Sequence, residues 1–285
     1  MKLYQVDAFT SRPFSGNPAA VCIVEEGISD TLMQQIAMEM NLSETAFVYI
    51  RENKTCHLRW FTPTAEVELC GHATLATAHV LFEQKLFQAQ ESISFDTLSG
   101  RLIVTKQDDE LVMDFPAIGQ QVCDITDNIV QALQTKAVFC GKTIDAKSRG
   151  NLGEISIDYL IEVVDEDTLR NIKPDFSLLR KEKAKGFVVT APASSGSSYD
   201  FVSRFFAPKI GIDEDPVTGF AHCILAPYWG KKLNKTVLKA YQASERGGEL
   251  GLSLHGERVH IRGKAVTILE GTLLPSVSNL RGLGV

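Results

Sequence analysis

The sequence predicts a mixed α/β (α+β) fold of two pseudo-symmetric domains, each with strands wrapped around an apolar central helix. Short β-type runs alternate with a few helical patterns, without the strand–helix rhythm, G-x-G-x-x-G or Walker loop of a nucleotide-binding fold. A weak internal repeat points to the two domains: Phe61-Thr62-Pro63 precedes Cys70 by the same spacing as Phe206-Ala207-Pro208 precedes Asp215. Chance recurrence of the F-x-P triplet is the alternative.

Hydrophobic periodicity places the individual elements. Ser29 is a good N-cap for a helix that runs to Met40, and two more apolar helices are expected over 73–82 and 217–229. Strands are expected at 3–9, 20–24, 45–50, 58–61, 92–97, 102–106, 111–115, 155–164, 186–190, 200–206, 237–241, 258–262 and 265–270.

The repeat also predicts where a ligand would bind. Two related domains facing each other would bring the starts of both central helices to one shared cleft. Free backbone N–H groups and the positive ends of the helix dipoles would converge there, which favours an anion. The last strands, around Val266–Leu273, are too few to form a unit and are expected to return to the first domain.

Composition narrows the class of protein. The 285 residues include 29 Lys and Arg against 35 Asp and Glu, so the net charge of -6 gives no reason to expect nucleic acid or an anionic membrane as partner. No run approaches the ~18 apolar residues of a membrane span, and the start MKLYQVDAF is unlike a signal peptide. We therefore expect a cytoplasmic protein with its six cysteines as thiols; without a C-x-x-C pair, a structural zinc site is not expected.

Three segments have residues suited to proton transfer. Glu44 lies where a loop enters an apolar strand; pointing inward it would serve as an acid or base, and pointing outward it would be an ordinary solvated residue. His72 follows Cys70-Gly71 in the first turn of a helix, where the helix dipole favours a neutral imidazole. An ordinary helix start with a partly exposed histidine is the alternative there.

The third segment is Asp215-Pro216-Val217-Thr218-Gly219. Aspartate at the N-cap followed by proline at the first helical position is a standard helix opening, so a purely structural cap is the simpler interpretation. Its repeat-related position opposite Cys70 favours a functional role. His79 and His222 fall in helices that are expected to be core.

These segments resemble the PhzF-like, or phenazine biosynthesis-like, protein family, including its animal members. The resemblance runs from residue 2 to about residue 273 and rests on five stretches in order: DAFTSRPFSGNPAAV (7–21), NLSETAFV (41–48), RWFTPTAEVELCGHATLATAHVL (59–81), EDPVTG (214–219) and SERGGELG (244–251).

The resemblance implies a diaminopimelate-epimerase-like fold with the active site between two domains, here 1–117 plus 271–285 and 118–270. It also implies an isomerase that needs no metal or organic cofactor, in which Glu44 relocates the proton. The matching motifs give His72 and Asp215 as its catalytic partners. The family's substrate-binding positions correspond to Asn17 and to the helix starts at Gly71, Ala73, Thr218, Gly219 and Phe220.

Two departures from the family pattern matter. Phe220 stands where the family usually has serine, which removes a hydroxyl and narrows the pocket, so the phenazine substrate itself is in doubt. The epimerase relatives use two facing thiols, whereas here the repeat partner of Cys70 is Asp215. Two-thiol epimerisation is therefore disfavoured.

The sequence thus predicts an isomerase that moves a proton on a small carboxylated substrate, and it allows a homodimer. The alternative is a non-catalytic binding or regulatory protein that keeps the same scaffold, since a fold does not fix a function. Retention of Glu44, His72 and Asp215 together favours the enzyme.

Overall fold

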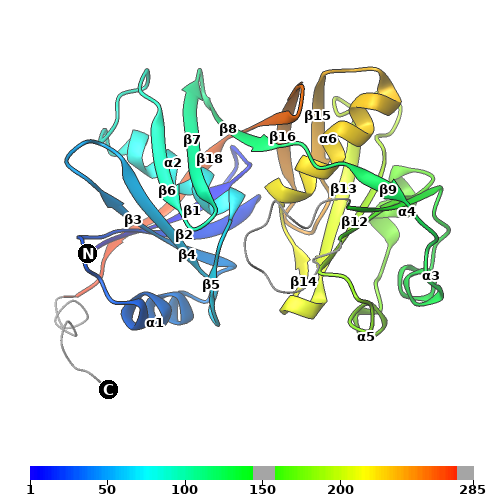
Figure 1. Cartoon of the computed structure of the whole chain (residues 1–285), viewed down its shortest axis with the longest axis horizontal. Helices are drawn as coiled ribbons and strands as arrows, with labels where there is room; N and C mark the ends of the chain where they lie inside the picture. Colours follow the sequence, from blue (N-terminus) through cyan, green and yellow to red (C-terminus); the bar gives the residue numbers. More distant parts are fainter. Residues whose placement is uncertain (144–157, 275–285) are drawn as a thin grey trace. The chain divides into compact units, whose positions relative to one another are not determined.

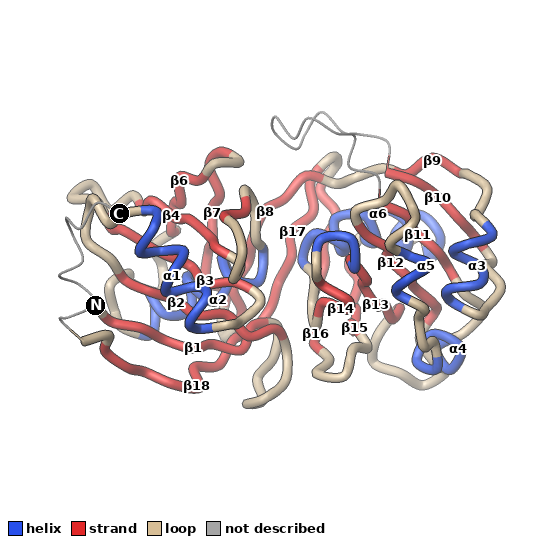
Figure 2. Tube along the Cα trace, turned by 90° about the horizontal axis from the view of Figure 1, so that it is seen from below, coloured by secondary structure: helices blue, strands red, loops and turns tan. Residues whose placement is uncertain are grey.

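A computed structural model describes residues 1–143 and 158–274 of the chain. The described residues divide into two compact units: 1–114 together with 262–274, and 115–143 together with 158–261. The second domain predicted over 118–270 is therefore too long at its end. Strand β18 (Ala265–Thr272) pairs antiparallel with β1 (Lys2–Ala8) along its length, so it belongs to the first unit (Figure 2).

Among the described residues, the first unit has two helices, and all of its strands except β18 lie between Lys2 and Pro116. Its helices are α1 (Asp30–Met40) and α2 (Gly71–Glu83). Besides β1 and β18, its strands are β2 (Asn17–Ile23), β3 (Glu44–Ile50), β4 (Cys56–Phe61), β5 (Glu66–Val67), β6 (Ile93–Thr97), β7 (Gly100–Gln107) and β8 (Glu110–Pro116), the last of which carries the chain into the second unit.

The second unit is richer in short elements. Its helices are α3 (Asp127–Leu133), α4 (Glu166–Asn171), α5 (Phe176–Leu179), α6 (Gly219–Leu233) and the 3₁₀ turn η1 (Pro208–Ile210). Its strands are β9 (Gln120–Val122), β10 (Phe139–Thr143), β11 (Asp158–Glu162), β12 (Gly186–Pro192), β13 (Phe201–Ala207), β14 (Ile212–Asp215), β15 (Val237–Gln242), β16 (Gly248–His255) and β17 (Arg258–Gly263), which returns the chain to the first unit. The strand predicted over 155–164 is described from Asp158; residues 155–157 lie outside the described residues.

The strands of the two units pair in the same order. In the first unit β1 is antiparallel to β2, β2 parallel to β3, β3 antiparallel to β4, and β4 antiparallel to β5 and parallel to β6. In the second unit β10, β11, β12, β13, β14 and β15 repeat each of these pairings in turn. A helix follows β5 in one unit and β14 in the other. The internal repeat predicted from the F-x-P spacing is therefore a repeat of the whole unit.

Each unit has one buried helix at the corresponding place. Helix α2 is buried on nearly all sides and packs against β1, β2, β3 and β18, among which it lies in Figure 1. Helix α6 is also largely buried and packs against β15 and β16. A helix that is apolar around its whole circumference needs cover on every side, which the curved strands supply. The predicted strand-wrapped central helices are confirmed.

Local chemistry explains the first helix. Ser29 is the N-cap of α1, because its Oγ accepts a hydrogen bond from the Leu32 N–H at 3.3 Å. Leu32, Met33 and Ile36 then form the buried face of the helix. The N-cap expected at Ser29 is confirmed.

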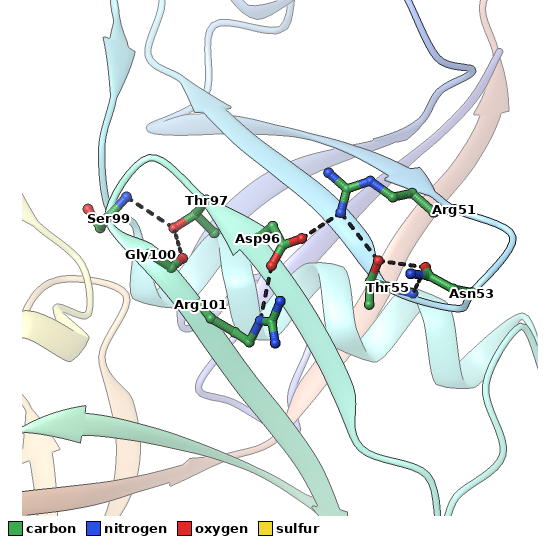
Figure 3. Close-up of polar contacts among 8 residues, drawn as sticks. All are labelled: Arg51, Asn53, Thr55, Asp96, Thr97, Ser99, Gly100 and Arg101. Atoms are coloured by element: carbon green, nitrogen blue, oxygen red, sulfur yellow. Dashed lines mark hydrogen bonds and ion pairs between the residues drawn. The ribbon is translucent and has the colours of Figure 1, made fainter.

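A polar network fixes the β6–β7 hairpin of the first unit (Figure 3). Arg51 lies 2.5 Å from Asp96, Arg101 donates to the same carboxylate at 3.1 Å, and the Thr97 hydroxyl donates to the Gly100 carbonyl at 2.7 Å. These side chains are partly exposed, so the ion pairs contribute little to the free energy of unfolding. Their main effect is to fix the conformation of the turn.

No helix among the described residues combines the length and the apolar character needed to cross a bilayer.

Candidate active site

Two side chains of the site come from neighbouring parallel strands. Asn17 is the first residue of β2 and Glu44 the first of β3, where it pairs with Ala19. Because parallel strands start at the same edge of a sheet, both side chains are placed at that edge. Gly16 makes the entry possible: its φ is +67°, and a Cβ there would lie 2.2 Å from the Ala8 carbonyl oxygen.

The third side chain comes from the start of α2. Cys70 is the N-cap of this helix, but its side chain makes no capping hydrogen bond. His72 is the second helical residue and is only 5% exposed. The partly exposed Gly71 begins the helix, where backbone N–H groups have no intrahelical acceptor and the dipole is positive.

Glu44, His72 and Asn17 meet in a buried cluster. Glu44 Oε2 lies 3.1 Å from His72 Nε2, and the Asn17 amide nitrogen lies 3.1 Å from His72 Nδ1. Cys70 Sγ lies 3.5 Å from the same Nδ1. Glu44 is 8% exposed, so it points inward, as the functional interpretation requires. An inward carboxylate in contact with an imidazole is a pair between which a proton can pass.

The charge state predicted for His72 is wrong. Burial lowers its pKa, but the neighbouring Cys70 sulfur and Glu44 carboxylate raise it, and the result is a pKa well above the usual 6.5. The Cys70 sulfur and the Glu44 carboxylate together outweigh burial, so this direction of shift favours the imidazolium over the neutral ring that the helix dipole alone would favour. The sequence could not show this, because the contact joins two residues from different elements.

The same cluster has the donor types of a metal site. Single ligand atoms of Glu44, Cys70 and His72 lie within 4.8 Å of one another. Burial, followed by the Glu44 charge, raises the pKa of the Cys70 thiol to about 11. Binding of a metal ion here would release protons from the thiol and the imidazole, so its affinity would depend on pH.

The start of α6 has a different construction. The helix begins at Gly219, two residues later than predicted, with Thr218 as N-cap. Asp215 is the last residue of β14, and its carboxylate accepts a hydrogen bond from the Thr218 hydroxyl. The Thr218 N–H donates to Gln242 Oε1 at 2.8 Å, and the Gln242 amide donates to the Asp215 carbonyl at 2.7 Å. Asp215 is therefore not the helix N-cap, because Gln242 holds this segment extended.

His222 completes this second network. It is fully buried, as expected for a core residue; its Nδ1 lies 2.8 Å from the Thr218 carbonyl and its Nε2 lies 3.5 Å from the Ser203 hydroxyl. Burial lowers its pKa to about 4, against a smaller opposing effect of the Thr218 carbonyl. His222 is therefore neutral.

Gln242 is a residue that the sequence reasoning missed. It continues the inward-facing alternation of Leu238 and Ala240 in β15 and is itself fully buried. A polar residue at an inward position of an alternating strand was the available signal.

The remaining predicted binding residues lie at the two helix starts. Gly71 and Ala73 belong to the first turn of α2, and Gly219 and Phe220 to the first turn of α6. Thr218 uses its N–H, hydroxyl and carbonyl within its own unit. The structure thus brings Asn17, Glu44 and His72 together in the first unit, while Asp215 and Thr218 meet each other in the second.

The comparisons with known proteins agree with the motifs. The family model described as phenazine biosynthesis-like protein matches residues 6–271. The chain belongs to this family. An uncharacterized isomerase from Pseudomonas aeruginosa is 48% identical over 274 residues, which cover 96% of this chain and 98% of that protein. Another relative with the name uncharacterized isomerase, from Halalkalibacterium halodurans, is 44% identical over 95% of this chain and 98% of its own.

Solved structures place the fold in the same group. A PhzF-family protein from Enterococcus faecalis is 44% identical, with a TM-score of 0.86 over 96% of this chain and 99% of that one. The phenazine biosynthesis-like, epimerase-type fold that the resemblance implies is therefore confirmed.

Proposed function

We propose that this protein is an isomerase that moves a proton between two carbon atoms of a small carboxylated metabolite, with Glu44 as the acid and base. The observation that carries the proposal is the buried contact of 3.1 Å between Glu44 Oε2 and His72 Nε2. The isomerase names of the bacterial relatives support the same class of reaction.

The proposed reaction leaves the substrate's composition unchanged. The Glu44 carboxylate takes a proton from a carbon next to a carbonyl or double bond, and the electron pair of that C–H bond moves into the conjugated system. The carboxylic acid then returns a proton to a different carbon, which regenerates the carboxylate. One such group contributes roughly 10²–10⁴-fold to a rate.

His72 and Asn17 are positioning residues in this proposal. His72 Nε2 lies 3.1 Å from Glu44 Oε2 as its ion-pair partner and so fixes which carboxylate oxygen faces the ring. Asn17 holds the other ring nitrogen at 3.1 Å. A doubly protonated ring has an N–H at Nδ1, so it requires the amide oxygen of Asn17, which accepts, in place of the amide nitrogen. Asn17 thereby keeps the ring in the plane that meets Glu44.

The start of α2 is the proposed site for the substrate carboxylate. The Cys70 side chain does not cap the helix, and Gly71 is partly exposed with no Cβ to block approach. Backbone N–H groups at this positive helix end favour a carboxylate. A substrate carboxylate held at Gly71 would lie beside His72, the next residue along the chain. It would therefore also lie close to Glu44, which contacts His72.

The test is proton exchange with heavy water. The protein is incubated in D₂O with a panel of small unsaturated and carbonyl-activated carboxylic acids, and deuterium in each acid is measured by mass spectrometry. We expect the wild type to label at least one acid. Glu44→Gln keeps the shape of the side chain but not the transferable proton, so its labelling rate should be lower than that of the wild type by a factor of about 10² or more. Its Kd for the acid should stay within about tenfold of the wild-type value.

Glu39→Gln is the matched control, because Glu39 is an exposed residue of α1 in the same unit. It should label as the wild type does. Equal labelling by wild type and Glu44→Gln would remove Glu44 from the mechanism. Binding of an acid without any labelling would favour the non-catalytic binding protein. Asp215→Asn in the same assay tests the predicted role of Asp215.

A further inference from the structure

The six cysteines differ in their access to solvent. Cys22, Cys56, Cys70, Cys140 and Cys223 are buried, whereas Cys123 is partly exposed. Cys123 directly follows β9, and Cys140 is the second residue of β10, which pairs with β9. Both lie in the second unit, whereas the Glu44 cluster belongs to the first.

The backbone places these two cysteines directly opposite each other. Val122 pairs with Gly141 in the antiparallel register, and the Cys123 N–H donates to the Cys140 carbonyl at 3.1 Å. Opposite residues joined in this way have Cα atoms about 5.5 Å apart, within the roughly 4.4–6.8 Å that a disulfide spans. The two sulfurs lie 3.7 Å apart. Closing that gap to a bond of about 2.05 Å requires rotation of the two side chains.

We propose that Cys123 and Cys140 are a redox modification site that closes to a disulfide by exchange with a low-molecular-weight disulfide. The Cys123 thiolate attacks one sulfur of the small disulfide, which forms a mixed disulfide and releases one thiolate. The Cys140 thiolate then attacks the Cys123 sulfur and releases the second. The two protein thiols are oxidised, the small disulfide is reduced to two thiols, and those thiols receive the two protons.

The surroundings set the order of the two steps. Cys140 belongs to the hydrophobic core of the second unit, and Cys123 packs against that core while keeping access to solvent. Burial raises the pKa of Cys140 to about 12, and the neighbouring Cys123 adds to the effect. Cys123 is therefore the thiol that meets the oxidant. The contribution of Cys123 to the pKa of Cys140 ends once Cys123 carries the mixed disulfide.

Closure would tie down a defined segment. Helix α3 (Asp127–Leu133) lies between the two cysteines, and its residues Ile129, Ala132 and Leu133 pack in the same core. A bond across the base of this loop restricts the unfolded chain. We expect the oxidised protein to unfold at a temperature higher by roughly 5–10 °C.

The experiment uses the full chain, fully reduced and then exposed to oxidised glutathione. Free thiols are blocked with N-ethylmaleimide, and tryptic peptides are identified by mass spectrometry. Lys136 lies between the two cysteines, so they fall on separate peptides, 107–136 and 137–142. We expect these two peptides joined by a disulfide as the main product, together with the higher Tm.

Variants then test the order of the steps. Cys140→Ala should retain glutathione on Cys123, and Cys123→Ala should leave Cys140 unmodified. Cys56→Ala, at a buried cysteine of the first unit, is the matched control and should cross-link as the wild type does. The proposal is overturned if wild-type Cys123 retains glutathione without a cross-link, if it joins another cysteine, or if neither thiol is oxidised. The wild-type peptide map decides the question even where a variant fails to fold.

Discussion

The two units share one order of strands and one central helix, yet their helix starts are built from different chemistry. At the start of α2, His72 lies against the Glu44 carboxylate, and its pKa is well above 6.5 in spite of burial. In the first turn of α6, His222 has only a backbone carbonyl and a hydroxyl as partners, and burial lowers its pKa to about 4. The neighbouring Cys70 sulfur and Glu44 carboxylate thus separate a histidine whose pKa is raised from one whose pKa is lowered.

The polar groups at the two helix starts therefore differ in what they can do. The first unit places a carboxylate and an imidazolium in contact, which is an arrangement suited to proton transfer. The second unit uses Asp215, Thr218 and Gln242 mainly to satisfy one another's hydrogen bonds.

The largest expected effect is on stability against pH. The pKa of His222 is about 4 in the folded protein against 6.5 ordinarily, so its contribution is present above pH 6.5 and is lost as the pH falls through that window toward 4. The loss is on the order of 3 kcal/mol. His72 has the opposite sign: its raised pKa stabilises the fold below pH 6.5, and this is lost as the pH rises through the folded value.

Urea unfolding of wild type, His222→Gln and His72→Gln from pH 4 to 7.5 measures both effects. His222→Gln should flatten the fall in unfolding free energy below pH 6.5. His72→Gln should remove the gain in unfolding free energy that the wild type shows as the pH falls from 7.5 to 6.5, and should leave the slope below pH 6.5 unchanged. Parallel curves for all three proteins would contradict the contrast between the two histidines.

A change of reach at Glu44 should reduce the activity. Glu44→Asp withdraws the carboxyl by about 1.5 Å, which breaks its contact with His72 Nε2. We expect the labelling rate in heavy water to fall about 100-fold, or about 2.7 kcal/mol of activation free energy. Glu39→Asp serves as the exposed control. A Glu44→Asp rate within threefold of wild type would show that the placement of Glu44 is not critical.

A smaller effect is expected from the hydrogen-bond network of the second unit. Gln242→Leu leaves the Thr218 N–H and the Asp215 carbonyl without their partner, at a cost of about 1–2 kcal/mol. The free energy of unfolding in urea measures this, with Gln121→Leu at an exposed position of β9 as control. A loss no greater than that of the control would show that Gln242 does not hold this segment.

The sequence predicted what depends on local chemistry. Ser29 was recognisable as an N-cap, and the two central helices were recognisable because they are apolar on all sides. The short helices of the second unit were missed, although Thr126 and Asp165 cap α3 and α4 and were available as signals. The Asp215-Pro216 pair suggested a helix start that is wrong, because the segment is held by Gln242, which is distant in sequence.

For the site, the sequence motifs identified the residues but not the orientation of Glu44 or the pKa of His72. Glu44 and His72 were recognisable by motif, and the inward orientation of Glu44 was one of two alternatives that the sequence left open. The raised pKa of His72 depends on the Cys70 sulfur and on the 3.1 Å approach of the Glu44 carboxylate from β3. Such a contact follows from the packing of β3 against α2 and has no local pattern.

An NMR titration of the histidine side chains tests directly whether Glu44 and His72 form one coupled acid–base pair. We expect His72 to titrate well above 6.5 in the wild type and at a clearly lower pH in Glu44→Gln, while His222 stays neutral down to about pH 4 in both. If His72 titrates at or below 6.5 in the wild type, or is unmoved by Glu44→Gln, the pair is not coupled and the account is wrong.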